Sequence, residues 1–182
     1  MRTWFKFWRK RQLFIKRDLK KTRLFKILGH RIFSKMLWKI DKSAIAGGLS
    51  LGLFIAFMPT LGFQMILAAL GAILLKVNLP IALVACWVTN PLTVIPIYTA
   101  EWRLGKLILE DFTAIRVVFD LYAVEGRTVK IIMHGLYLWT GSLVFSLASA
   151  LTANVAVRTL WMISEYIQKP DFIKKNRIRK QE

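Results

Sequence analysis

Two clusters of polar residues, each built around proline, interrupt the apolar stretch between Ala44 and Ala100. The first cluster is Pro59, Thr60, Gly62 and Gln64; the second is Thr89, Asn90, Pro91, Thr93, Pro96 and Tyr98, and Asn78 lies between the two. Proline removes a backbone N–H and clashes with the preceding helical turn, so each cluster predicts a helix break. Amide and hydroxyl side chains can satisfy the backbone groups freed at a break, or can line a polar cavity whose half-helix ends attract ions or lipid headgroups. The residues alone leave both roles open.

The sequence shows no catalytic or metal-binding pattern. Its two histidines, His30 and His134, stand far apart, and Cys86 is the single cysteine. No Cys, His and carboxylate spacing typical of a metal site is present. The acidic residues after the second break are expected to be solvated, although Glu101 and Arg103 lie close enough to that break to touch a headgroup. We therefore expect no enzymatic activity, no metal and no cofactor.

The helical arms that carry these clusters are short. The first broken segment covers residues 44–75 and the second covers residues 79–100. An arm of about 15 residues is roughly 22 Å long as a helix, which is less than the roughly 30 Å of a hydrocarbon core. Each segment fits either a re-entrant hairpin or a kinked helix. Paired broken helices build midplane sites in transporters, although no residue-level repeat relates these two segments. Residues 134–157 predict one ordinary transmembrane helix, and residues 101–130 predict a surface segment.

Basic residues gather at the two ends of the chain, which carries a net charge of +18. Residues 1–43 combine Lys and Arg with Trp, Phe, Leu and Ile at helical spacing, which is typical of an interfacial amphipathic helix. Residues 161–182 form a basic tail. Basic residues beside apolar spans stay cytoplasmic and attract anionic lipid headgroups. We therefore expect both termini in the cytoplasm and a lipid bilayer, rather than nucleic acid, as the partner.

Small residues at helical spacing indicate close helix packing. They are Gly48, Gly52 and Ala56 in the first broken segment and Ser142 and Ser146 in the last helix. Such ridges let two helices approach within one subunit or across a homo-oligomer. With 55% hydrophobic residues, the chain is expected to be an all-α, helical integral membrane protein. It would contain two Pro-broken hairpins and one plain C-terminal transmembrane helix.

Three motifs together resemble the bacterial DUF2062 family. They are GGLSLGLFIAFMPTLGFQ at residues 47–64, VNLP at residues 77–80 and TNPLTVIPIY at residues 89–98. The resemblance covers about residues 35–160 and assigns residues 44–160 to the membrane domain. It implies a multi-pass protein of the bacterial inner membrane with no assigned biochemical role. Similar domains are attached to glycosyltransferase-like domains, which implies a lipid-linked substrate or a glycosyltransferase-type partner.

The expected function is transport or handling of a lipid, or of a small polar or lipid-linked solute, at a polar site made by the two breaks. Thr60, Gln64, Asn90, Thr93 and Tyr98 would supply its hydrogen bonds. The alternative is a non-transporting membrane adaptor or assembly protein. In that case the broken helices only pack, and the basic arm binds anionic lipid and a partner protein.

Overall fold

The computed structural model describes residues 34–110 and 127–178, in which every regular element is a helix. The elements are the 3₁₀ helix η2 (Lys35–Trp38) and the α-helices α3 (Lys42–Ala56), α4 (Gln64–Leu75), α5 (Leu79–Cys86), α6 (Val94–Glu110) and α8 (Arg127–Ile178). The all-α prediction is confirmed for these residues. The predicted interfacial helix in residues 1–43 lies mostly outside the described residues.

Helices α3 and α5 pack side by side and run in the same direction. A Cβ atom added to Gly48 would lie 2.6 Å from the Asn78 carbonyl oxygen, and one added to Gly52 would overlap the Ala82 backbone. Both contacts join residues with the same separation along the chain, which defines the parallel orientation. The two glycines are therefore contact points between helices of one subunit.

The segments around the two breaks repeat each other in backbone structure. Residues 51–70 and residues 81–100 pass through the same succession of helix, turn and helix, position by position except at one turn residue. The sequence shows no clear repeat, because residues 59–64 and 89–94, at the two breaks, differ in type position by position. Because α3 and α5 are parallel neighbours, the break that follows α3 and the break that follows α5 lie next to each other.

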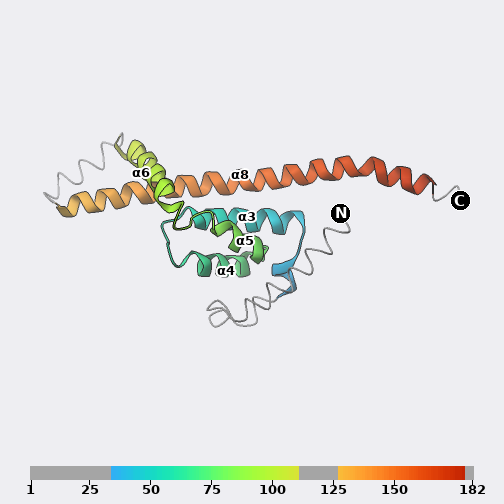
Figure 1. Ribbon diagram of the computed structural model, residues 1–182, viewed down its shortest axis with the longest axis horizontal. Coiled ribbons are helices and arrows are strands. Elements are labelled where there is room, and N and C mark those ends of the chain that lie inside the picture. Colours follow the sequence, from blue (N-terminus) through green and yellow to red (C-terminus); the bar gives the residue numbers. More distant parts are fainter. Residues whose placement is uncertain (1–33, 111–126, 179–182) are drawn as a thin grey trace.

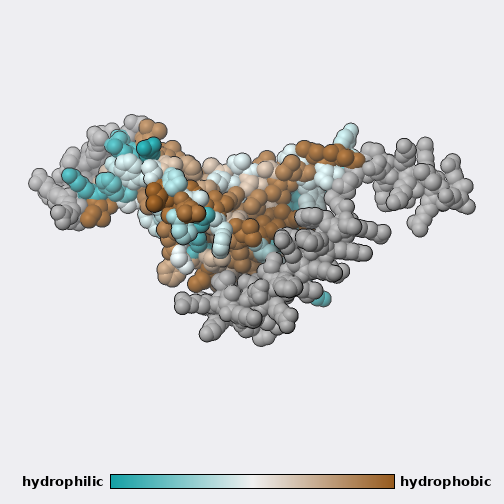
Figure 2. All heavy atoms as spheres, viewed as in Figure 1, coloured by the Kyte–Doolittle hydropathy of each residue, from teal (hydrophilic) through white to brown (hydrophobic). Residues whose placement is uncertain are grey.

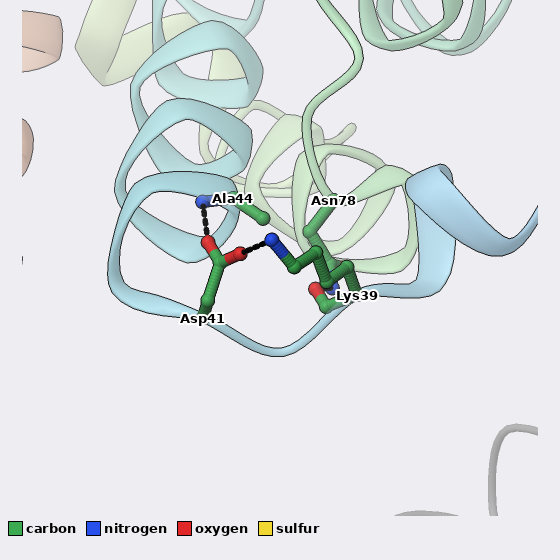
Figure 3. A network of polar contacts seen from close by, with 4 residues as sticks. All are labelled: Lys39, Asp41, Ala44 and Asn78. Carbon is green, nitrogen blue, oxygen red and sulfur yellow. Dashed lines mark hydrogen bonds and ion pairs between the residues drawn. The ribbon is translucent and has the colours of Figure 1, made fainter.

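A polar network fixes the start of α3 beside the start of α5 (Figure 3). Asp41 caps α3 by accepting a hydrogen bond of 2.7 Å from the Ala44 N–H, and it also pairs with Lys39. The hydrogen bond from Lys39, followed by that from Ala44, lowers the pKa of Asp41 below its usual value. Asn78 caps α5 at Ile81 N (3.1 Å) and donates to the Lys39 carbonyl oxygen (2.8 Å). The two helix starts are thus tied together by their own caps.

Helix α3 lies between α8 on one side and α5 and α4 on the other (Figure 1). Helix α8 runs antiparallel to α3. Asn154 Nδ2 donates to Ser50 Oγ (3.2 Å), and the rings of Phe57 and Phe145 lie 6.0 Å apart. The buried apolar residues under η2, α3, α4 and α5 form one core cluster.

Helix α6 crosses α8 at a steep angle and in backbone contact (Figure 1). A Cβ atom at Gly105 would overlap the Tyr137 carbonyl oxygen, and one at Gly141 would overlap the Glu101 carbonyl oxygen. The crossing therefore depends on two glycines, one from each helix.

Two helices extend further than the sequence suggests. Pro96 does not interrupt α6, because it occupies the first turn, where a backbone N–H has no partner within the helix. Helix α6 then continues through Glu101 to Glu110, where a separate surface segment is expected from residue 101. Residues 111–126 of that segment lie outside the described residues. Helix α8 has 52 residues, roughly 78 Å, and extends well past residues 134–157 at both ends.

Among the described residues, one helical segment is long and apolar enough to cross a membrane. It is Lys130–Ile167 within α8, which has 38 residues. Little of its surface is buried inside the protein, and Leu143, Leu147 and Leu151 are exposed along it. Figure 2 shows apolar residues over much of the middle of α8 and the helices beneath it. At 15, 12 and 8 residues, α3, α4 and α5 are each shorter than the roughly 20 residues of a crossing.

Candidate functional site

The two breaks interlock into a single junction, residues 56–64 with residues 86–98. Thr89 Oγ1 donates to the Ala56 carbonyl oxygen (2.7 Å), which is freed where α3 ends. In return, Gln64 Nε2 donates to the Thr89 carbonyl oxygen (3.1 Å). Thr89 is fully buried. Side chains of each break therefore satisfy backbone groups of the other.

The second break is organised by Asn90 and Thr93. The Asn90 side-chain oxygen accepts from Leu92 N (2.9 Å) and Thr93 N (3.2 Å), as an N-cap does at the start of a helix. Thr93 Oγ1 accepts from Asn90 N (2.9 Å) and donates to the Val88 carbonyl oxygen (2.6 Å). Pro91 lies inside this closed turn, where its missing N–H removes no hydrogen bond. Asn90 and Thr93 thus both bond to backbone groups of their own break.

The first break turns through Pro59 and Gly62. Helix α3 ends at Ala56, ahead of Pro59. Gly62 has φ +86, a left-handed conformation that residues with a side chain seldom adopt. Tyr98, from α6, reaches across and donates to the Met58 carbonyl oxygen (3.4 Å). The Met58 carbonyl oxygen also accepts from the Thr60 N–H (2.7 Å), so Tyr98 adds a second donor to it.

Two polar atoms of the junction have no partner. Thr60 Oγ1 and Gln64 Oε1 are both buried and make no hydrogen bond. Each can accept a hydrogen bond, and the threonine hydroxyl can also donate one. Leaving such an atom buried and unpaired costs about 1–3 kcal/mol. Since the other amide and hydroxyl side chains of the junction have partners, these two atoms are its candidates for contact with a ligand.

An apolar groove of about 580 Å³ lies beside the junction, between α6 and α8. Its lining residues are Val94, Ile95, Tyr98, Thr99, Trp102, His134, Gly135 and Leu138. Tyr98 belongs to both features, because its ring lines the groove while its hydroxyl bonds to Met58. Trp102 and His134 stack with ring centroids 5.5 Å apart. A polar junction and an apolar groove therefore share one wall.

Of the other predicted residues, Asn78 lies away from the junction, Pro96 and Ala56 lie within it, and Ser142 and Ser146 lie on α8. Asn78, predicted with the cavity-lining group, is fully buried at the opposite end of α5 as a helix cap. Pro96 lies in the first turn of α6. Ala56 is buried at the end of α3, whereas Ser142 and Ser146 are buried on α8. The structure thus brings residues 59–64 and 89–98 together and separates Asn78 from them.

From the sequence, Glu101 is expected to be solvated or to touch a lipid headgroup, and its burial is not predicted. It is fully buried, and its Oε2 atom accepts a hydrogen bond from Ser142 Oγ (2.6 Å). A signal was present in the sequence: Glu101 stands one helical turn before Gly105, so both share a face of α6. The surface-segment prediction hid this signal, because it ended the helix before both residues.

Within the described ranges, no group of three or more His, Cys, Asp or Glu side chains forms a metal site. No curated protein and no solved structure matches the chain. The family model described as "Uncharacterized protein conserved in bacteria (DUF2062)" matches residues 25–169. This match spans most of the chain, including every described helix from η2 through the long apolar part of α8. The chain therefore belongs to the DUF2062 family of bacterial proteins.

Proposed function

We propose that this protein is embedded in the bacterial inner membrane and handles a lipid or lipid-linked solute at the interlocked breaks. The observation that carries the proposal is the pair of buried, unpaired atoms Thr60 Oγ1 and Gln64 Oε1 in a junction whose other amide and hydroxyl side chains have partners. An unpaired buried polar group is unfavourable in the folded protein, so a ligand that bonds to it gains affinity.

The chemistry of the site favours an amphipathic ligand that donates hydrogen bonds. Gln64 Oε1 is an acceptor only, so it suits a hydroxyl or ammonium group rather than a bare phosphate oxygen. The neighbouring groove is lined mainly by apolar and aromatic side chains and suits an acyl or polyprenyl chain. A lipid with a hydroxyl- or amine-bearing headgroup would place one part in each.

The membrane placement rests on α8 and on the charge at the ends of the chain. The Lys130–Ile167 segment is longer than one crossing requires, and its apolar side chains are exposed. Basic residues cluster in positions 1–43 and after Val157, which favours cytoplasmic termini and requires the segments before α8 to supply an odd number of net crossings. The shorter helices α3, α4 and α5 would lie partly within the bilayer, since side chains within the protein satisfy their broken ends.

A membrane adaptor is the second candidate, and one observation favours it. Thr89, Asn90, Thr93 and Tyr98 all bond to the protein's own backbone. If the junction served only to hold the fold, these hydrogen bonds would be its whole purpose. The basic N-terminal residues would then recruit anionic lipid and a partner protein.

Mass spectrometry of lipids that co-purify with the full chain separates the two candidates. The informative variant is Thr60→Val, because it removes an unpaired hydroxyl without breaking any hydrogen bond of the protein. Thr152→Val is the matched control, since the Thr152 hydroxyl is exposed on α8 and bonds only to the Ala148 carbonyl. We expect Thr60→Val to fold normally and to lose a specific lipid that Thr152→Val retains.

Gln64→Leu tests the second unpaired atom, with Thr89→Val as its control. Both substitutions break one hydrogen bond of the junction, but only Gln64→Leu removes an unpaired acceptor. Selective lipid loss in Gln64→Leu supports handling of a lipid. Identical lipid profiles in wild type, Thr60→Val and Gln64→Leu would reject the lipid site and leave the adaptor.

A further inference from the structure

A carboxyl group lies enclosed at the crossing of α6 and α8, one helical turn beyond Tyr98. Glu101 has no exposed surface, and Ser142 Oγ donates to its Oε2 atom at 2.6 Å. Its Oε1 atom makes no hydrogen bond. Ser146, one helical turn beyond Ser142 on the same face of α8, is also fully buried with an unpaired hydroxyl. Two fully buried oxygen atoms, Glu101 Oε1 on α6 and Ser146 Oγ on α8, thus lack partners.

No described cation neutralises Glu101. On α6, Lys106 pairs with Glu110 (3.5 Å) and lies over the Trp102 ring, while Arg103 is exposed. Tyr98, one turn earlier, uses its hydroxyl on Met58.

The elements packed against α6 and α8 supply no cation either. On α8, the His134 ring nitrogen Nδ1 bonds to the Lys130 carbonyl oxygen (2.6 Å), and Tyr137 is buried beside the crossing. Helix α3, which packs on α8, carries no charged side chain after Lys42. None of the described residues would therefore supply a counter-charge to a carboxylate here.

An ionised carboxyl removed from water is strongly unfavourable unless it is paired, so this one requires a positive partner. The available ligand atoms are all oxygens: two carboxyl oxygens and two serine hydroxyls. Hard cations favour such oxygen ligands. We propose that Glu101, with Ser142 and Ser146, forms an exchangeable site for a small monovalent cation, either a proton or Na⁺. This site is independent of the lipid function proposed above.

Carbodiimide labelling of the full chain in detergent micelles tests the site. Dicyclohexylcarbodiimide is apolar and reacts with protonated carboxyl groups, and peptide mass spectrometry locates the modified residue. Glu110 and Glu165 serve as internal controls, because neither is buried. We expect Glu101 to be labelled faster than both controls near neutral pH, with labelling that slows as the pH rises.

To distinguish Na⁺ from the proton, the labelling is repeated in NaCl and in KCl at equal ionic strength. Protection of Glu101 by NaCl alone identifies Na⁺ as the ligand, whereas equal labelling in both salts identifies the proton. Thermal unfolding in the same salts gives a second readout. A Na⁺ site predicts stabilisation of wild type by NaCl over KCl that disappears in Glu101→Gln and persists in Glu110→Gln. Labelling of Glu101 no faster than the controls, together with no Na⁺-specific stabilisation, overturns the proposal.

Discussion

Gly141, one of the two glycines at the crossing of α6 and α8, gives a stability prediction. Gly141→Ala places a Cβ atom that overlaps the Glu101 carbonyl oxygen and lies 3.0 Å from Gly105 N. These neighbours are backbone atoms of α6, so no side-chain rotation relieves the overlap. Ordinary C···O contacts are about 3.3 Å or longer, and the helices must separate to restore one. The separation also pulls Ser142 away from Glu101.

Two opposing contributions determine the expected change in the free energy of unfolding. Overpacking a close contact costs about 1–3 kcal/mol, and sometimes more when backbone must move. Alanine regains up to about 1 kcal/mol over glycine through its higher helix propensity. Gly135→Ala isolates the second term, because Gly135 is in the same helix with nothing within 4 Å of an added Cβ. We therefore expect Gly135→Ala to be neutral or stabilising, and Gly141→Ala to be less stable than it by about 2 kcal/mol or more.

The assay is the free energy of unfolding of the full chain in mixed micelles, titrated with a denaturing detergent and followed by circular dichroism. Both variants are compared with wild type under one lipid and detergent composition, so that the membrane contribution cancels. A Gly141→Ala protein as stable as Gly135→Ala would show that α6 and α8 do not cross in backbone contact.

Three further predictions concern the helix ends. Asn78→Ala loses both the cap of α5 and the bond to the Lys39 carbonyl oxygen, and should lower the unfolding free energy by about 2 kcal/mol; a change below the error of the titration would contradict the network. Thr89→Val leaves the Ala56 carbonyl oxygen without its donor and should cost about 1–3 kcal/mol, whereas retained stability would mean that the breaks do not interlock. The contacts that lower the pKa of Asp41 stabilise the fold above its unfolded value, near 3.8, and this contribution is lost as pH falls through the lower folded pKa. Asp41→Asn should therefore reduce the loss of unfolding free energy at acid pH. An unchanged loss would contradict the pairing of Asp41 with Lys39.

Much of the fold could be predicted from local sequence. Asp41 and Asn78 stand just before apolar runs as helix N-caps do, and Pro59 and Pro91 mark both breaks. The continuation of α6 from residue 101 to Glu110 is not predicted, although Glu101 and Gly105 stand one helical turn apart. Its charged side chains are typical of a solvated surface segment, yet Gly105 allows close contact with α8 and so buries Glu101.

Part of the candidate site could likewise be predicted from the sequence, and part could not. The polar residues of the breaks were identifiable by type, because amides and hydroxyls are what a broken helix needs. Their individual roles depend on which carbonyl oxygen each one faces. Asn90 and Thr93 cap a turn within their own break, while Thr89 and Gln64 join the two breaks. Thr60 and Thr89 are the same residue type, but the Thr89 hydroxyl has a partner and the Thr60 hydroxyl has none, which no sequence pattern reveals.

By itself, the sequence determined the helical class, the positions of the two breaks and the family motifs, because proline, glycine and capping residues act on the backbone within a few positions. Only the tertiary structure decided that the broken segments repeat each other as parallel neighbours, and that their polar residues interlock. It also enclosed Glu101 between α6 and α8. These features join residues that are distant in the chain. They arise where small residues let two helices approach closely. A sequence pattern identifies those residues but does not show which helices they bring together.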